Sequence, residues 1–456
     1  MYEKDIIIAP ISALQGGSIN MLRLSGEGAV ECADAFFSRD LINAPGGRFY
    51  FGHLQNKNRI IDDVIVYIFR APHSFTGEDV VEISCHGNFF ITEEILNTFI
   101  DAGCRLAEPG EFSRRAFLNS KMDLLQAEAV ADLIAAKNKS AVKNSLKQLH
   151  GGLSHSIQSI KEKLIHLASM VELDIDFSEE EIDIIPYDEI RKEIEVLTDD
   201  LKRLINTYHT GKNFTSSSEV LLLGKPNVGK SSLMNALINR ERVIVSGQPG
   251  TTRDHIHEDI LIHDHLVRLI DSAGIRRKAE AIEKAGVKRS VQLIEDAVLI
   301  LLVVDLSQPA DSDDSIVFEQ LKKHHHKIRI IGNKKDLSVH PDMLSTLEKY
   351  FTGIPVIQVS AREKENIDVI HDTIGAYLRT HTEDHEHIIT NARHHRLLKQ
   401  CVTQLEQTRE AVEQQLGPEF LSVDFRTAIN YLAELTGDVT TDDILNHIFS
   451  NFCIGK

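Results

Sequence analysis

The stretch that decides the fold is an apolar strand, Val220 to Leu223, followed by the loop Gly224-Lys225-Pro226-Asn227-Val228-Gly229-Lys230-Ser231 and a helical segment, 232–238. Glycines allow the backbone N–H groups of such a loop, and the N-terminus of the helix after it, to surround phosphates. The closing lysine binds the β- and γ-phosphates, and the serine offers its hydroxyl to Mg²⁺. The sequence therefore predicts a P-loop that binds nucleotide through Asn227, Val228, Gly229, Lys230, Ser231 and Ser232.

Three further motifs follow apolar strands, in the chain order in which a doubly wound sheet places its ligand. They are Asp271-Ser272-Ala273-Gly274, Asn333-Lys334-Lys335-Asp336 and Ser360-Ala361. The carboxylate of Asp336 only accepts hydrogen bonds, and guanine presents a ring N–H and an amine to it where adenine has no donor. We therefore predict a GTP site with base contacts from Asn333, Lys334, Asp336, Ser360 and Ala361, while Asp271 supports Mg²⁺.

A loop between the P-loop helix and the next strand reads Ser246-Gly247-Gln248-Pro249-Gly250-Thr251-Thr252. GTPases carry there a segment whose threonine reaches Mg²⁺ when the γ-phosphate is present, and we assign that role to Thr252. A Thr-Thr pair is also common turn chemistry. After Gly274 the chain has Ile275, where Ras-like GTPases have the glutamine that orients the attacking water. Either hydrolysis is slow, or another group orients the water.

The organisation of the chain predicts three domains, because 456 residues exceed the roughly 150 of an ordinary domain. Short apolar runs separated by Gly and Pro indicate an α+β domain over 1–119. Apolar residues at three- and four-residue intervals predict an all-α domain over 120–215 plus 380–456, split by an inserted α/β GTPase domain over 216–379, with its core from Glu219 to Arg379. The Ser-rich stretch 214–218 is expected to be a linker.

The composition limits where the protein is expected in the cell and which partners it can bind. No apolar run approaches the roughly 20 residues that span a bilayer, and the first residues resemble neither a secretory signal nor a transit peptide. We expect a cytoplasmic protein without a membrane segment, with its five dispersed cysteines reduced. A formal charge of -18 opposes a broad grip on phosphate backbones, so any nucleic-acid contact is expected to be local or shared with a partner.

The chain resembles the MnmE (TrmE) family of tRNA modification GTPases along its whole length. The most specific matches are PGEFSRRAFLN (109–119), KMDLLQAEA (121–129) and the terminal FCIGK (452–456). The resemblance implies a homodimer whose N-terminal domain binds 5-formyltetrahydrofolate or a related one-carbon folate. It also implies a heteromeric complex with an FAD-binding flavoprotein of the MnmG type. Together they would add a carboxymethylaminomethyl or aminomethyl-type group at C5 of the wobble uridine of tRNAs.

The same resemblance assigns further site residues. Asn227, Ser246, Gln248 and Thr251 match ligands of K⁺, a cation that would supply positive charge where other GTPases use an arginine finger. Glu283 matches a carboxylate that positions water, with Thr251 and Thr252 beside it in catalysis; a solvated helix face over 280–288 is the alternative. Arg23, Glu82, Lys121 and Lys456 match folate-binding residues, each of which alone would be an ordinary surface charge.

Two departures from the family and three alternatives stay open. Ser272 replaces the usual threonine, and the loop 11–18 lacks the usual Thr-Pro and second glycine pair. Cys453 either takes part in chemistry or partner contact, or is a small buried residue. The clustered histidines, including 324–326, are interpreted as solvated and not as a metal site. The rival function is a GTP-switched RNA or ribosome assembly factor without modification chemistry.

Overall fold

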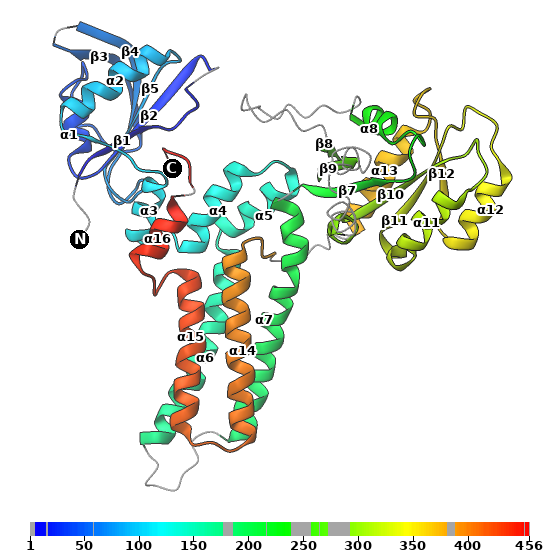
Figure 1. Cartoon of the computed structure of the whole chain (residues 1–456). Coiled ribbons are helices and arrows are strands. Elements are labelled where there is room, and N and C mark those ends of the chain that lie inside the picture. Colours follow the sequence, from blue (N-terminus) through cyan, green and yellow to red (C-terminus); the bar gives the residue numbers. More distant parts are fainter. Residues whose placement is uncertain are drawn as a thin grey trace. The chain divides into compact units, whose positions relative to one another are not determined.

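The computed structural model describes residues 5–14, 17–57, 59–176, 186–215, 217–238, 257–263, 265–271, 292–380, 388–450 and 452–455 (Figure 1). It divides into two compact units. One contains Met1–Ala135, Ser145–Arg203 and Ala392–Lys456, and the other contains Ala136–Asn144 and Leu204–Asn391. The chain thus leaves the first unit and returns to it, as around an inserted domain. The predicted boundaries at 119, 215 and 379 stay predictions.

The N-terminal part of the first unit is a six-stranded sheet in the order β3-β4-β5-β2-β1-β6. Neighbouring strands are antiparallel except β1 and β6. Helices α1 (Ala29–Asp34) and α2 (Phe89–Asp101) share one hydrophobic core with the sheet. This arrangement confirms the α+β prediction. The strands are β1 (Ile7–Pro10), β2 (Ile19–Ser25), β3 (Arg48–Asn56), β4 (Arg59–Phe69), β5 (Val80–His86) and β6 (Arg105–Leu106).

Alternation along the strands separates the two faces of this sheet. In β4, Val64, Val66 and Ile68 are buried in the core with α2, because successive side chains point to opposite faces. On β3, the edge strand, Phe49 and Phe51 are instead exposed. The sheet therefore has one covered face and one that carries exposed aromatic side chains at its edge.

The rest of the first unit is helical, and α15 packs along both α14 and α6 (Figure 1). Apolar residues of α14 and α15 at the predicted spacing are buried, Leu398, Cys401 and Leu405 among them. The all-α prediction is therefore confirmed. The helices are α3 (Glu111–Leu118), α4 (Leu124–Ala135), α5 (Lys139–Leu149), α6 (Gly152–Asp176), α7 (Tyr187–Thr215), α14 (Ala392–Glu413), α15 (Pro418–Thr436) and α16 (Asp442–Phe449); α5 and α7 each extend into the second unit.

A buried ion cluster joins α4 to α14. Oε2 of Glu128 lies 2.7 Å from Nη2 of Arg393 and 2.6 Å from Nε2 of His394. Burial opposes ionisation of Glu128, but the charges and hydrogen bonds of His394 and Arg393 outweigh it and lower the pKa of its carboxyl to about 2. The cluster therefore fixes the register of two helices that are distant in the sequence.

The second unit contains a doubly wound sheet in the order β12-β11-β10-β7-β9-β8. All neighbouring strands are parallel except β8 and β9. This confirms the α/β prediction for the central region. Its elements are β7 (Ser218–Leu223), α8 (Lys230–Ile238), β8 (His257–Ile262), β9 (His265–Asp271), β10 (Leu299–Asp305), α11 (Ser312–Leu321), the 3₁₀ helix η2 (Lys322–Lys327), β11 (Ile328–Asn333), α12 (Pro341–Tyr350), β12 (Val356–Gln358) and α13 (Ile367–Thr380).

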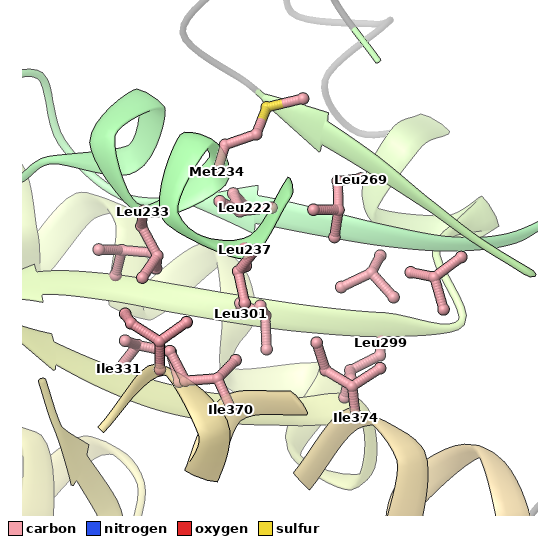
Figure 2. Close-up of a cluster of buried hydrophobic side chains, with 14 of the residues drawn as sticks. Leu222, Leu233, Met234, Leu237, Leu269, Leu299, Leu301, Ile331, Ile370 and Ile374 are labelled. Carbon is pink, nitrogen blue, oxygen red and sulfur yellow. The ribbon is translucent and has the colours of Figure 1, made fainter. Parts of the chain in front are cut away.

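Helices α8 and α13 cover one face of this sheet. Figure 2 shows Leu233 and Leu237 of α8, and Ile370 and Ile374 of α13, gathered over strand residues such as Leu301. Every residue of β10 is buried, as expected for a central parallel strand. This packing positions the carboxyl ends of the strands, and those ends carry the predicted motifs.

The predicted linker at 214–218 is wrong in extent. Helix α7 continues to Thr215, and β7 already begins at Ser218, where the side chain is buried. Serine and threonine are only slightly unfavourable within helices, so this Ser-rich stretch does not by itself end regular structure. The two elements follow each other almost directly.

Candidate functional site

The P-loop connects buried strand β7 to α8, which begins at Lys230. Asn227 has φ 64° and Gly229 has φ 99°, so the loop turns through left-handed conformations. A Cβ at Gly229 would lie 2.2 Å from Nδ2 of Asn333, and one at Gly224 would lie 2.2 Å from the carbonyl oxygen of Val303. Both glycines are therefore required by close contacts as well as by the backbone.

Two side chains that are predicted to bind phosphate and Mg²⁺ lie at the start of α8. Nζ of the buried Lys230 donates to the carbonyl oxygens of Gly224 at 2.9 Å and Lys225 at 2.8 Å, within the loop itself. Oγ of Ser231 donates to Oδ2 of Asp271 at 2.8 Å. The hydroxyl predicted to bind Mg²⁺ and the carboxylate predicted to support it are thus neighbours, and oxygen donors of this kind suit Mg²⁺.

The guanine motifs contact the P-loop through Asn333 at the end of β11. Its Nδ2 donates to the carbonyl oxygen of Val228 at 2.9 Å, and its Oδ1 accepts from the N–H of Ala361 at 3.0 Å. Ser360 is buried, and its hydroxyl donates to Oδ1 of Asp336 at 2.6 Å. The structure therefore brings together the phosphate loop, the Asp336 loop and the Ser360-Ala361 turn.

Lys334, which has φ 64°, lies between these motifs and is held by the end of β10. Its Nζ donates to Oδ2 of Asp305 at 2.6 Å. Burial opposes ionisation of Asp305, but hydrogen bonds from Lys334 and Ser307 outweigh it and hold the pKa of this carboxyl below its ordinary value. Sequence reasoning missed Asp305, although its place at the carboxyl end of a central strand could have identified it.

Lys225 is a second residue that the sequence did not identify. Its Nζ contacts Oδ2 of Asp311 at 2.8 Å and Oδ2 of Asp314 at 2.7 Å. Burial would lower the pKa of Lys225, but the two hydrogen-bonded carboxylates outweigh it and hold the pKa above its ordinary value. Lys225 thereby ties the P-loop to the N-terminus of α11.

Several predicted site residues lie outside the described residues. They are Ser246, Gly247, Gln248, Pro249, Gly250, Thr251, Thr252, Ser272, Ala273, Gly274, Glu283 and Lys456. Ser232 is described and exposed at the start of α8.

In the N-terminal part, Arg23 of β2 and Glu82 of β5 are cross-strand partners. Nε and Nη2 of Arg23 both lie 2.8 Å from Oε1 of Glu82. Cζ of Arg23 is 5.0 Å from the ring centre of Phe75 and 5.4 Å from that of Phe112. The guanidinium therefore contacts one carboxylate and two aromatic rings. Neither of the two ring contacts was predicted from the sequence.

Lys121 follows α3 and lies near segment 72–77, which also contains Phe75. Its Nζ donates to the carbonyl oxygen of Pro72 at 2.9 Å, and its Cγ would be 3.2 Å from a Cβ placed on Gly77. Segment 72–77 thus touches Lys121 and, through Phe75, Arg23. A separate cavity of about 910 Å³ does not include these predicted residues in its described lining of Asp5, Glu27, Gly28, Glu31, Ala71, Glu78, Asp79, Arg115, Leu118 and Asn119.

The C-terminal tail contacts the N-terminal part of the same unit. The N–H of Gly110 donates to the carbonyl oxygen of Cys453 at 3.4 Å, and a Cβ on Gly455 would be 2.2 Å from the carbonyl oxygen of Pro10. The side chain of Cys453 is exposed, so the interpretation of Cys453 as a small buried residue is wrong. Nη1 of Arg114 donates to Oδ1 of Asn446 at 2.9 Å and supports α16.

Other predicted features concern metals, thiols and membranes. Among the described residues, no group of three or more His, Cys, Asp or Glu side chains is placed to hold a metal ion. The cysteines are free thiols, and Sγ of Cys32 lies 3.5 Å from Sγ of Cys104. Within the described ranges no helix is both long and apolar enough to cross a membrane.

Two comparisons concern the whole chain. The family models for the MnmE helical domain and for the GTP-binding protein TrmE N-terminus match residues 124–453 and 6–121. The tRNA modification GTPase MnmE of Aquifex aeolicus is 40% identical over 456 residues, which cover 99% of this chain and 100% of that protein. Its counterpart in Chlorobaculum tepidum is 38% identical, with 98% and 97% covered.

Solved structures match a smaller part. The G domain of the FeoB iron transporter of T. maritima is 24% identical, has a TM-score of 0.27, and covers 36% of this chain and 99% of that one. Translation elongation factor SelB of Methanococcus maripaludis is 16% identical, with a TM-score of 0.27 and coverages of 36% and 34%. On the two family models and the full-length relatives, the chain belongs to the MnmE family of tRNA modification GTPases.

Proposed function

We propose that this chain is a cytoplasmic GTP hydrolase that acts with an FAD-binding flavoprotein of the MnmG type. Together they modify C5 of the tRNA wobble uridine with a carboxymethylaminomethyl or aminomethyl-type group. The observation that carries the GTP assignment is Asn333, which joins the P-loop at Val228 to the Asp336 and Ala361 loops through two hydrogen bonds. Family membership carries the tRNA assignment.

In hydrolysis, water attacks the γ-phosphorus and the bond to the β–γ bridging oxygen breaks, giving GDP and phosphate. Lys230 would exchange its contacts with Gly224 and Lys225 for phosphate oxygens, and Ser231 would turn its hydroxyl toward Mg²⁺. Bound Mg²⁺ supplies positive charge at the phosphates. Asp271 then holds the ion's coordination sphere in place.

The proposed replacement for an arginine finger is K⁺, bound by Asn227 with help from Ser246, Gln248 and Thr251. Asn227 supports this role because it lies in the P-loop directly before Val228 and Gly229, and its backbone is left-handed, with φ 64°. Glu283 would orient the water that Ile275 cannot, and Thr252 would complete the Mg²⁺ site.

The K⁺ proposal is tested with Asn227→Gly, which removes the amide but permits φ near 64°. We expect the wild type to hydrolyse GTP on the order of tenfold faster in K⁺ than in Na⁺ at equal ionic strength, a smaller effect than an arginine finger gives. The variant should lose that ratio and still bind a fluorescent GTP analogue. Asn235→Ala, on the exposed side of α8, is the control. Equal wild-type rates in both salts would remove K⁺ from the mechanism.

We further propose that Arg23, Glu82, Lys121 and Lys456 bind 5-formyltetrahydrofolate or a related one-carbon folate. Arg23 supports this because its planar guanidinium lies over Phe75 and Phe112 and, among the described residues, hydrogen-bonds to a single carboxylate oxygen, Oε1 of Glu82. A guanidinium pairs well with the carboxylates of a folate, and Glu82 can accept from pterin donors. Cys453 would act beside these residues.

The open edge of the N-terminal sheet supports a homodimer. Phe49 is 66% exposed and Phe51 is 54% exposed, and they face the same way as their cross-strand partners Tyr67 and Ile65. Contiguous exposed aromatic residues on an edge strand are typical of a protein interface. A second copy of the same edge is the simplest partner because such interfaces are self-complementary.

The function is tested by mass spectrometry of tRNA nucleosides from cells that lack this chain. Wild-type protein and the exposed-residue control Lys192→Ala should restore the C5-modified wobble uridine, whereas Lys230→Ala should not, because Lys230 lies inside the P-loop. If the deletion leaves the wobble uridines unchanged, the proposed modification function is wrong. Accumulated ribosome precursors in those same cells would then favour the assembly-factor alternative.

A further inference from the structure

Two of the five cysteines are in contact in the N-terminal part of the chain. Sγ of Cys32 lies 3.5 Å from Sγ of Cys104, although the two residues are 72 positions apart in sequence. Cys32 is on α1 and half-buried, whereas Cys104 is buried directly before β6. Elsewhere, burial raises the pKa of the Cys85 and Cys401 thiols, which keeps them protonated and unreactive. The contact between Cys32 and Cys104 is therefore a place where thiol chemistry could join two separate elements.

The backbone holds both cysteines in position. The N–H of Cys32 donates to the carbonyl oxygen of Gly28 at 2.9 Å, within the turn of α1. Helix α2 ends at Gly103, which has φ 101°, and the N–H of Cys104 then donates to the carbonyl oxygen of Phe99 at 3.0 Å. This is the hydrogen-bond pattern of a Schellman motif, which fixes the chain just after a helix. The two sulfurs are thus brought together by ordered backbone on both sides.

The two thiols differ in a way that suits sequential reaction. The hydrogen bond between the sulfurs lowers the pKa of Cys32 and outweighs the opposing effect of its burial. The same hydrogen bond, together with burial, raises the pKa of Cys104. Because the thiolate is the nucleophilic form of cysteine, the half-buried Cys32 is the first to react with a small oxidant. Cys104 stays a thiol in contact with it.

We propose that Cys32 and Cys104 form a reversible dithiol–disulfide site that hydrogen peroxide oxidises in the folded chain. The Cys32 thiolate attacks one peroxide oxygen, an S–O bond forms, and the O–O bond breaks to release hydroxide, which takes up a proton. Cys104 then attacks the sulfur of the sulfenic acid, the S–S bond forms, and the S–O bond breaks as water leaves with the Cys104 proton. Two thiols and one peroxide thus give one disulfide and two waters. This proposal does not depend on the GTP or tRNA assignments.

The disulfide would link elements that are already neighbours. The sulfurs must approach from 3.5 Å to about 2.0 Å. The ring of Phe36, just after α1, lies 5.4 Å from the ring of Phe99 on α2, edge to face, so the same two helices pack together in the reduced chain. Closing so long a loop restricts the unfolded chain more than the folded one. Oxidation should therefore stabilise the N-terminal part of the chain.

The test uses the full-length chain with Cys453→Ser, which removes the exposed thiol. The reduced protein is treated with hydrogen peroxide, remaining thiols are blocked with a maleimide, and a digest made without reductant is analysed by mass spectrometry. Thermal unfolding is followed before oxidation, after it, and after dithiothreitol. In this background Cys32→Ser is the test variant, and Cys85→Ala, which removes a buried thiol of β5, is the matched control.

We expect one cross-linked peptide that joins Cys32 to Cys104, with two thiols lost per chain and both recovered in dithiothreitol. The Tm of the N-terminal part should rise by on the order of 5 °C on oxidation and fall back on reduction. Cys85→Ala should give the same cross-link and the same shift in Tm. Cys32→Ser should give neither.

Two results would overturn the proposal. One is Cys32 recovered as its sulfinic acid while Cys104 is still a free thiol, because the second thiol would then have failed to react. The other is a Cys32 that remains a thiol after peroxide treatment. Both are read from peptides of the chain that retains Cys32 and Cys104, so the outcome is decided even if Cys32→Ser does not fold.

Discussion

The nucleotide site and the proposed folate site around Arg23 and Glu82 are built from different parts of the polypeptide. In the nucleotide site, short motifs at strand ends bring backbone groups together, and Gly224 and Gly229 leave no room for a Cβ. In the proposed folate site, Arg23 and Glu82 meet across two strands, 59 residues apart in sequence. The first site depends on the path of the main chain and the second on individual side chains. Single substitutions should therefore lower ligand affinity strongly in the first site and only modestly in the second.

The largest effect is expected for Gly229→Ala. The new Cβ would lie 2.2 Å from Nδ2 of Asn333, which cannot move away because its amide is bonded to both Val228 and Ala361. GTP affinity should fall on the order of 100-fold, or about 2.7 kcal/mol, as measured by titration with a fluorescent GTP analogue. Folate affinity should stay unchanged.

Gly353→Ala is the matched control for this variant. Gly353 also has positive φ, 80°, but nothing lies within 4 Å of a Cβ placed there. It should lower stability by roughly 1 to 2 kcal/mol through backbone strain and leave GTP affinity intact. If Gly229→Ala lowered GTP affinity no more than this control does, the close contact with Asn333 would not determine GTP binding.

A smaller effect is expected for Arg23→Lys in the proposed folate site. Lysine keeps the charge but loses the planar stacking on Phe75 and Phe112. Two such contacts contribute roughly 0.5 to 1 kcal/mol each, so the Kd for 5-formyltetrahydrofolate should rise about tenfold in calorimetry. Arg59→Lys, at a side chain that is 76% exposed, should change nothing. Unaltered folate affinity in Arg23→Lys would show that stacking on Phe75 and Phe112 does not contribute to folate binding.

The buried cluster of Glu128, Arg393 and His394 lies outside both sites, so Glu128→Gln should change neither GTP nor folate affinity. Its effect is on stability and depends on pH. Because the pKa of Glu128 is lowered from 4.5 to about 2 in the folded chain, its contribution is complete above about pH 4.5 and is lost as pH falls toward 2. The difference in Tm between wild type and variant should therefore narrow over that interval.

Thermal unfolding between pH 7 and pH 3 measures this difference. Glu406→Gln, whose carboxylate contacts Lys202 on the surface at 2.8 Å, is the control and should show little change at any pH. A Tm difference for Glu128→Gln that does not vary with pH would mean that the carboxylate contributes through shape and not through charge.

The contrast between the two sites also explains what the sequence could predict. The P-loop, Asp336 and the Ser360-Ala361 turn were predictable because each is a local motif after an apolar strand. Contacts between Lys225 and α11, and the aromatic rings around Arg23, join residues that are distant in the sequence and leave no local pattern. The proposed folate site rests on the family resemblance alone, because no local pattern predicts it. The linker expected at 214–218 is shorter than predicted because serine and threonine also occur in helices and strands.

The hydrogen bonds of Asn333 determine when the GTP site can form during synthesis of the G domain. Its partners, Val228 and Ala361, belong to the beginning and the end of this domain, so the site closes only after nearly the whole domain has been synthesised and folded. A ligand that binds only the folded state stabilises it by mass action. Cellular GTP should therefore protect the finished domain from unfolding and proteolysis, while a nascent chain that ends before Ala361 gains no such protection.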